Sequence, residues 1–278
     1  MDMNQQSVIS KIFKEEITDF SINLEKDYSI SGGKYENISR KSNNFLISSL
    51  SKEIMIYSAL MRSFDSSMGN RVEKIALKIA EASGWKVAQG VEGTLSTETV
   101  GLIAKLLDAY KDKSNPKVPE KNDLMLIQQS AVSTEGKSKF HNSDYLLEKE
   151  KDGIKYITLM ELKAGGDLDN KKARSEKEAI LEQYSILCSE HKKQLADKKV
   201  KISVFFGTIY NKDSLNEGKE NWQQGSVKSF FANEELLIGK DFWNYICDSD
   251  EGWELIKKEY SSNSHLIEAS LQKVINSF

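Results

Sequence analysis

Residues Ile154–Gly166 read IKYITLMELKAGG, and this stretch decides the fold. The apolar run from Tyr156 to Met160 predicts a strand that is covered on both faces. The strand ends on Glu161 and Lys163, and two glycines break it at once. Residues two apart in a strand point to the same face, so these two charges project together. Because burying an unpaired charge costs free energy, they need partners: each other, water or a metal ion.

The segments on either side predict a hairpin and a parallel crossover. A strand at about 143–148 and a turn at 151–153 precede the central strand. After it, residues 169–195 have helical spacing, and Asp169 or Asn170 is the expected N-cap. Residues 200–210 are again a hydrophobic strand. A strand, a helix and a second strand in this order predict a parallel βαβ unit with a right-handed crossover.

The rest of the chain is predicted to be mainly helical. Residues 45–64 and 71–84 show apolar helical spacing, and the sequence DSSMGN (65–70) between them is expected to break the chain. Residues 123–129 are expected to form a first strand. The sequence therefore predicts a mixed α/β (α+β) fold with a small central mixed β-sheet flanked by helices. We expect an N-terminal helical region (1–62), a core (63–210) and a C-terminal helical region (211–278), packed as one compact unit.

Composition limits the class of protein. The chain has 278 residues, 39% of them hydrophobic, and a formal net charge of −3. No window approaches the ~18 consecutive apolar residues that a membrane span needs. The two cysteines and three histidines are scattered, which argues against a disulfide scaffold or a zinc site. We therefore expect a soluble cytoplasmic protein, and a mildly acidic balance does not exclude a local nucleic-acid surface.

Asp144 is the third charge expected near Glu161 and Lys163. It opens the first strand of the hairpin, and pairing across the turn places it beside the end of the second strand. Carboxylates at this position, with the backbone carbonyl of Leu162, suit Mg²⁺, and the lysine can orient an attacking water. That combination is the chemistry of phosphodiester hydrolysis. The glycines at 165–166 are expected to let a ligand or backbone approach closely. The alternative is that Glu161 and Lys163 form an ordinary solvated pair.

At these residues the sequence resembles the PD-(D/E)XK nuclease superfamily. Ser143-Asp144 matches its first acidic motif, with serine in place of proline, and Glu161-Leu162-Lys163 matches the second. The resemblance implies a restriction-endonuclease-like core in the order αβββαβ, which we equate with residues 63–210. It also implies that a glutamate of the first core helix can join the metal site, and Glu73 in GNRVEKIALKIA occupies that position.

More narrowly, three stretches look like type II restriction endonucleases, of the TdeIII-like or ApaLI-like groups. They are RSFDSSMGNRVEKIA, ELKAGGDLDNKKARSEKEAILEQY and EELLIGKDFWNYIC. The resemblance implies a homodimer that cuts double-stranded DNA at a short palindrome with Mg²⁺, alongside a cognate DNA methyltransferase. It also implies recognition or dimerisation elements in residues 211–278. Two alternatives are another nuclease of the superfamily, for repair or mobile elements, and a non-enzymatic helical interaction protein.

Several residues are candidates for DNA contact. A basic helix start can hold backbone phosphates, although a solvated face with pairs such as Arg174 with Glu178 is the alternative. Its members are Lys171, Lys172, Arg174 and Lys177. His141 could contact a phosphate, and the resemblance allows Gln183 to approach the catalytic face. The polar loop at 211–227 could read bases through its Asn, Gln and Lys side chains, or it could be an ordinary loop.

Overall fold

The structure, a computed structural model, describes residues 1–36, 40–131, 136–141, 145–213 and 217–277. Contacts divide the chain into two compact units. The first unit comprises Met1–Ala82 with Glu251–Phe278, and the second is Ser83–Asp250. The three regions expected from the sequence, and their packing as one compact unit, stay a prediction.

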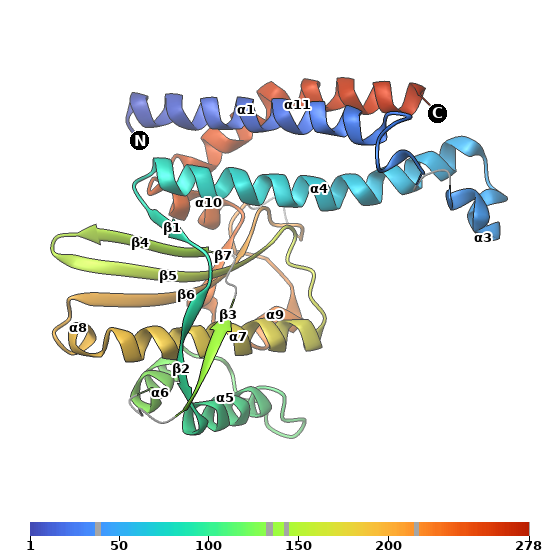
Figure 1. Cartoon of the computed structure of the whole chain (residues 1–278). Coiled ribbons are helices and arrows are strands. Elements are labelled where there is room, and N and C mark those ends of the chain that lie inside the picture. The colour runs from blue at the N-terminus through green and yellow to red at the C-terminus, as the bar shows by residue number, and fades with distance from the viewer. Residues whose placement is uncertain (37–39, 132–135, 142–144, 214–216, 278) are drawn as a thin grey trace. The chain divides into compact units, whose positions relative to one another are not determined.

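Long helices build the first unit (Figure 1). They are α1 (Met3–Tyr28), α4 (Lys52–Ala82) and α11 (Gly252–Asn276), with the short η1 (Arg40–Asn43) and α3 (Phe45–Ser48) before α4. Helix α1 lies against both α4 and α11. Part of the shared core is a cluster of buried side chains from these three helices: Leu24, Tyr28, Ile56, Leu60 and Val274.

The predicted break at 65–70 is wrong, because α4 runs straight through it. Buried residues keep helical spacing on both sides of DSSMGN, with Ile56 and Leu60 before it and Ile75 and Ile79 after it. A single glycine inside a helix costs only about 1 kcal/mol, which such packing outweighs. The interruption comes earlier, between α3 and α4, so residues 45–64 are not one helix.

A five-stranded sheet forms the centre of the second unit. Across the sheet the strands are β1 (Lys86–Ala88), β4 (Tyr145–Lys151), β5 (Ile154–Lys163), β6 (Val200–Thr208) and β7 (Leu236–Ile238). Strand β4 is antiparallel to both neighbours, whereas β5, β6 and β7 are parallel. Helix α7 (Asn170–Glu190) connects β5 to β6, which confirms the predicted βαβ unit. Short elements complete this part: α8 (Lys192–Ala196), α9 (Gly225–Lys228) and η2 (Asn233–Glu235).

The hairpin of β4 and β5 turns where the sequence predicted. Lys151 pairs with Ile154, so Asp152 and Gly153 alone form the turn. Their φ angles are +54° and +72°. Positive φ at both central residues is the geometry that an Asp-Gly hairpin turn favours. This tight turn sets the register along the whole hairpin.

The expected strand at 123–129 is wrong: these residues belong to helix α6 (Asn122–Ser130). Leu124 and Ile127, three apart, are buried, while Met125 and Leu126 between them are exposed, which is a helical pattern. Asp123 holds the start of the helix, since its carboxylate accepts hydrogen bonds from the Glu120 amide and the Tyr110 hydroxyl. The strand that completes the sheet is instead β1, which pairs with β4.

Between β1 and β4 the chain makes an excursion. It contains α5 (Thr97–Ala109), α6 and a second, two-stranded sheet of β2 (Val91–Ser96) and β3 (Gly136–His141). In Figure 1, β2 runs from the main sheet towards α5 and α6, and β3 runs back towards the main sheet. Gly93 of β2 packs closely on Ile186 of α7, where an added Cβ would lie 2.3 Å from the Ile186 side chain.

Helices cover both faces of the main sheet, as predicted. On one face, Ile157 and Leu159 of β5 pack in one cluster with Ile180 and Leu181 of α7. On the other, α10 (Lys240–Cys247) places Tyr245 in hydrogen-bond contact with Thr158. The result is the predicted α/β fold, compatible with a restriction-endonuclease-like core. No helix in the described ranges combines the length and the apolar character that crossing a membrane requires.

Candidate active site

The two charges of the opening stretch lie at the end of β5, on the face that α7 covers. Because side chains alternate along a strand, Glu161 and Lys163 continue the row begun by Ile157 and Leu159. Those two apolar residues are buried at 1% and 0% exposure and pack with α7. Glu161 and Lys163 are 14% and 32% exposed. The apolar half of this row is therefore buried in the core, and the charged half, Glu161 and Lys163, is partly accessible to solvent.

Lys163 lies between two carboxylates. Its ammonium donates a hydrogen bond to Glu161 Oε1, and it lies 3.6 Å from Glu176 Oε1 in the second turn of α7. The charges thus have the partners that burial requires. Sequence reasoning missed Glu176, because only the crossover brings this part of α7 over the end of β5. Two carboxylates facing one ammonium can hold it in a fixed direction while leaving it partly open to solvent.

Asp144, the third predicted member, lies outside the described residues. Its successor Tyr145 is the first residue of β4 and pairs with Met160, the residue before Glu161. Leu162, whose backbone carbonyl was expected to face the metal, is in β5 opposite Gly207 of β6. Among the described residues, no group of three or more His, Cys, Asp or Glu side chains is arranged to hold a metal ion. The predicted set includes Asp144 and is therefore not tested.

Glu73, the fourth catalytic candidate, belongs to α4 in the first unit. It is half-buried there, on the helix that the sequence predicted for it. Glu161 belongs to the second unit, so the part that Glu73 plays in the site stays a prediction.

The glycines after β5 lie against side chains of this chain, rather than against the ligand or backbone that we expected to approach them. A Cβ on Gly165 would lie 2.9 Å from the Tyr210 hydroxyl, and one on Gly166 would lie 2.8 Å from the Trp222 ring. Gly166 also has a φ of +76°, which favours glycine. The two parallel strands end side by side, and a hydrogen bond from Ile209 N to Ala164 O (3.0 Å) continues their pairing. The chain itself therefore fills this space.

The basic start of α7 divides into exposed and engaged side chains. Lys171 and Lys172 are exposed. Arg174 forms an ion pair with Asp108 of α5 (2.7 Å), whereas the solvated-face alternative had named Glu178 as its partner. Tertiary contact has replaced the local pairing, because Arg174 lies on the side of α7 that meets α5. Only the exposed pair keeps the free ends that a phosphate contact needs.

Two other members of this segment have structural roles. Lys177 is only 2% exposed and hydrogen-bonds both carboxylate oxygens of Glu235 at 2.7 Å. It is therefore not available to DNA. Asp169 is the N-cap of α7 and accepts a hydrogen bond from the Lys172 amide at 2.8 Å, which confirms the capping prediction.

Gln183 and His141 have different environments. Gln183 is 2% exposed, so it is not a surface residue, and its Oε1 has no hydrogen-bond partner among the described residues. The adjacent Glu182 binds Lys139 of β3 at 2.7 Å. His141 ends β3 and pairs with Val91, but its side chain lies outside what the structure describes. Contact of either residue with DNA stays a prediction.

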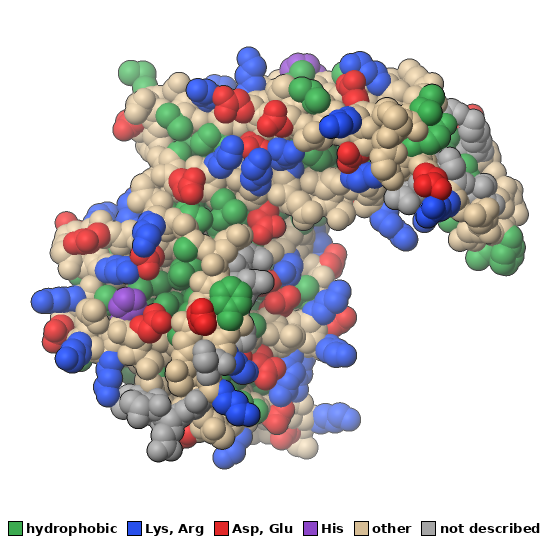
Figure 2. Space-filling view, in the orientation of Figure 1, with side chains coloured by type: hydrophobic (Ala, Val, Ile, Leu, Met, Phe, Trp, Pro, Cys, Tyr) green, Lys and Arg blue, Asp and Glu red, His purple; other side chains and the backbone are tan. Residues whose placement is uncertain are grey.

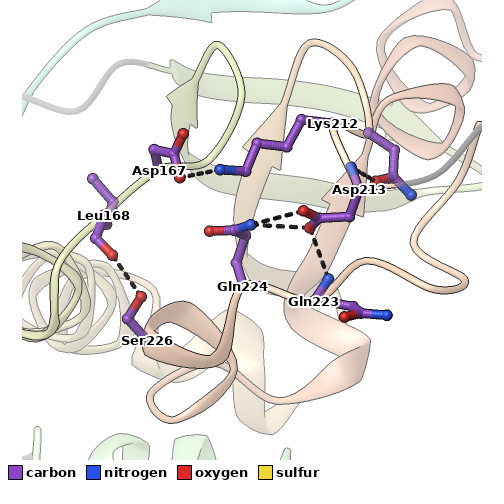
Figure 3. A network of polar contacts seen from close by, with 8 residues as sticks. Asp167, Leu168, Lys212, Asp213, Gln223, Gln224 and Ser226 are labelled. Carbon is purple, nitrogen blue, oxygen red and sulfur yellow. Dashed lines mark hydrogen bonds and ion pairs between the residues drawn. The ribbon is translucent and has the colours of Figure 1, made fainter.

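The polar loop after β6 is tied together by its own side chains (Figure 3). Asp213 accepts hydrogen bonds from the Gln223 amide (2.8 Å) and from the Gln224 side chain (2.9 and 3.2 Å). The Gln224 bond, with that of the Gln223 amide, holds the pKa of Asp213 below its usual range. Asn211 closes the loop by donating to Gly218 O at 2.8 Å. The Gln224 and Asn211 amides are thus engaged within the loop, and base reading stays a prediction.

The same loop is joined to the segment that follows β5. Lys212 forms an ion pair with Asp167, and Ser226 donates a hydrogen bond to Leu168 O at 2.5 Å (Figure 3). Both segments begin where parallel strands end. These contacts tie the segment that follows β5 to the loop that follows β6.

A comparison with protein families defines the class: the chain matches a type II restriction endonuclease. The family model, described as "Type II restriction endonuclease, HinfI", covers residues 5–264, so the chain belongs to the HinfI family. It is therefore a DNA nuclease, a hydrolase, and the non-enzymatic alternative is set aside. The sub-groups expected from the sequence, TdeIII-like or ApaLI-like, are not the family found. A comparison with curated proteins gave no match.

Proposed function

We propose that this chain is a Mg²⁺-dependent endonuclease of the PD-(D/E)XK superfamily. It hydrolyses phosphodiester bonds in double-stranded DNA at a short specific sequence. One observation carries the proposal: Glu161 and Lys163 stand together at the end of a covered core strand, where the buried row gives way to solvent. A polar pair at such a place is positioned by the sheet and remains reachable by substrate.

Asp144 and Glu161, with the carbonyl of Leu162, would hold the metal ion. The pairing of Tyr145 with Met160 supports this, because Asp144 precedes one member and Glu161 follows the other. The donor set fits Mg²⁺, since carboxylate and carbonyl oxygens are the ligands that this hard cation takes. Bound there, Mg²⁺ would lower the pKa of a water molecule and stabilise developing negative charge.

Lys163 would orient the attacking water and offset phosphate charge. An ammonium has three N–H donors and no acceptor, so it can bind Glu161 and still donate to a water or a phosphate oxygen. Glu176, 3.6 Å away, would keep it directed toward the site. Glu73 is a further candidate for an outer metal position.

DNA contacts and partners complete the proposal. Lys171 and Lys172 are exposed at the start of α7 and would bind backbone phosphates. His141 is a further candidate for DNA contact, whereas Arg174 would have to leave its ion pair with Asp108 and Gln183 would have to become accessible before either could contact DNA. We further propose a cytoplasmic homodimer that acts beside a cognate DNA methyltransferase, as the superfamily resemblance implied.

Substitution at the site tests the proposal. Lys163→Ala and Asp144→Ala should keep sequence-specific DNA binding and lose cleavage, because the changes remove chemistry and not the DNA surface. Binding is measured by a mobility-shift assay in Ca²⁺ and cleavage by a plasmid assay in Mg²⁺. Glu150→Ala, an exposed glutamate near the turn of the same hairpin, is the matched control and should cut normally. Normal cutting by either site variant means that the assignment is wrong.

The cleavage ends test the choice between a restriction enzyme and the rival nuclease without a fixed site. Digestion of a defined plasmid should give discrete bands whose ends map to one short sequence. A smear, or nicking at scattered positions, supports the rival instead.

A further inference from the structure

Tyr210 is an exposed aromatic side chain just past the end of β6, in the second unit. Its side chain is 47% exposed. The hydroxyl forms no hydrogen bond with any residue that the structure describes. A single exposed aromatic residue is normal on a protein surface, so exposure alone assigns it no role. What distinguishes Tyr210 is its place beside the candidate active site.

The pairing of β5 with β6 fixes that place. Lys163 lies opposite Thr208 at the end of the parallel pair. One further hydrogen bond, at 3.0 Å, continues the pairing past this point and brings Tyr210 level with Gly165. Residues two apart along a strand lie on the same face, so Tyr210 follows Thr208 as Gly165 follows Lys163. Tyr210 therefore stands next in line beyond the charged end of β5.

Gly165 supplies the space that the Tyr210 ring occupies. A Cβ added to Gly165 would lie 2.9 Å from Tyr210 Oη and 3.3 Å from Cζ. The first distance is too short for a real contact, so the ring could not keep this position beside a larger residue. The tyrosine thus packs on the chain immediately after the strand that carries Glu161 and Lys163, and the glycine at this point of the sequence is what admits it.

The backbone around Tyr210 is held from several sides. Thr208 Oγ1 donates a hydrogen bond to Tyr210 O at 2.9 Å, and Trp243 Nε1 donates to the preceding carbonyl at 2.9 Å. Figure 3 shows that Lys212, two residues further along, reaches across to Asp167 in the segment after β5. A fixed backbone with an uncommitted donor at the end of the side chain is what a preorganised contact requires.

The chemistry of the hydroxyl suits a phosphate oxygen of DNA. On the face of the second unit that Figure 2 shows, Lys and Arg side chains are intermingled with Asp and Glu, so charge alone does not mark the path of the DNA. Uncharged donors, tyrosine among them, make many of the contacts to phosphate oxygens that fix a protein's position on a duplex. The tyrosine O–H is such a donor at neutral pH.

We propose that the Tyr210 hydroxyl donates a hydrogen bond to a phosphate oxygen that neighbours the scissile phosphate. Tyr210 is thus a substrate-contacting residue that positions the strand, while Glu161 and Lys163 carry the chemistry. Fixing the strand on both sides of the reacting phosphate raises the rate because it holds the phosphorus in line with the attacking water. The inference rests on the proposed function, since it takes the Glu161–Lys163 pair as the place of cleavage.

Tyr210→Phe tests the contact, because it removes the donor and keeps the ring on Gly165. Single-turnover cleavage in Mg²⁺ should slow about 10-fold or more, the loss expected for one hydrogen bond to a charged group. The urea denaturation curve should stay that of the wild type. Tyr156→Phe makes the same change on the opposite face of β5, seven residues before Lys163, and should cut at the wild-type rate.

A scan of the substrate separates a phosphate contact from a structural role. The probe is a duplex oligonucleotide with the mapped cut site and an uncharged methylphosphonate at one phosphate at a time. In the wild type, a methylphosphonate beside the scissile phosphate should slow cleavage, and in Tyr210→Phe the same substitution should cost little more, because the two changes remove one contact. Equal penalties in both enzymes at every phosphate overturn the contact.

The controls distinguish failure of this inference from failure of the proposed function. If Lys163→Ala is inactive and Tyr210→Phe cuts like the wild type, the contact is wrong and the proposed function stands. If Lys163→Ala cuts normally, the proposed function is wrong, and the place given to Tyr210 is wrong with it.

Discussion

Two lysine–glutamate groups, each of which includes a residue of α7, differ in their surroundings. Lys177 is 2% exposed, and both of its bonds go to one carboxylate, Glu235, which is itself 4% exposed. Its ammonium also lies 4.8 Å from the centre of the Phe231 ring. Lys163 is 32% exposed and lies between two carboxylates, Glu161 and Glu176, at the edge of the core. Lys177 is thus buried in its ion pair, whereas Lys163 is partly accessible to solvent.

The difference teaches how to separate a structural ion pair from a functional one. Glu235 is fully occupied, since it also accepts the Ala232 amide at 2.8 Å. A buried ion pair of this kind is not accessible to a ligand. Removing one partner leaves the other as a buried charge with no opposite charge beside it. The group around Lys163 keeps solvent access and carries excess negative charge, which favours a cation. Burial and charge balance, more than the presence of Glu and Lys, distinguish the two.

Breaking the enclosed pair should have the largest effect on stability. Lys177→Met leaves Glu235 buried and unpaired, and we expect a loss of about 3–5 kcal/mol in the free energy of unfolding. Adding Glu235→Gln should restore part of this loss, because a neutral amide oxygen can still accept the Ala232 amide. Urea denaturation measures both, with the exposed Lys171→Met as control. A loss below about 1 kcal/mol would show that the pair is not structural.

A third charged group, around Glu16 in the first unit, allows the buried and exposed charges to be compared by the pH dependence of stability. Glu16 is buried, which opposes ionisation, but hydrogen bonds from Lys78, Arg71 and Lys74 outweigh this and lower its pKa to about 2. A carboxyl with a depressed folded-state pKa contributes stability above its usual pKa, which is lost as pH falls from about 4.5 toward 2. Glu16 therefore belongs with Lys177 as an enclosed, structural charge.

Denaturation at several pH values sharpens that assignment. The wild type should lose stability steeply between about pH 4.5 and 2. Glu16→Gln should be less stable than the wild type at pH 7 and should lose less over the acid range. Glu15→Gln, at an exposed neighbour that pairs with Lys11 at 3.8 Å, should keep the wild-type slope. Equal slopes in wild type and Glu16→Gln would contradict the role given to Glu16.

Local signals made much of the second unit predictable. Asp152-Gly153 specifies a tight hairpin, and the observed β5 has the bounds expected from its apolar run. Asp169 caps α7 where a capping residue precedes a helical pattern. The prediction that the Glu161 and Lys163 side chains lie on the same face of the sheet follows from the alternation of side chains along a strand alone. In each case a few adjacent residues carry the whole signal.

The rest depended on contacts between distant residues. Strand β1 has only three residues, which is too short for an alternating pattern to identify it in the sequence. It forms by pairing with a strand about 60 residues further along the chain, in which Lys86 lies opposite Glu148. The apolar run at 123–129 is so short that it fits the periodicity of a strand and that of a helix equally well. The hydrogen bond between Asp123 and Tyr110, which lies outside this run, favours the helix. Glu176 meets Lys163 only because the crossover returns α7 over β5. Asp144 lies outside the described residues, so its position stays a prediction.

The smallest effect on stability is expected for a change at the partly exposed group around Lys163. Glu176→Gln removes one partner of Lys163 in a partly exposed group, where ion pairs contribute only about 0–1 kcal/mol. We expect the free energy of unfolding to change within that range. The cleavage rate of bound DNA should fall while DNA affinity is kept, because Lys163 loses a contact that directs it. Urea denaturation and single-turnover cleavage measure the two effects, and Glu178→Gln on the same helix is the control. If Glu176→Gln destabilises the protein as much as Lys177→Met does, the group around Lys163 is a structural ion pair, and the distinction between the two sites fails.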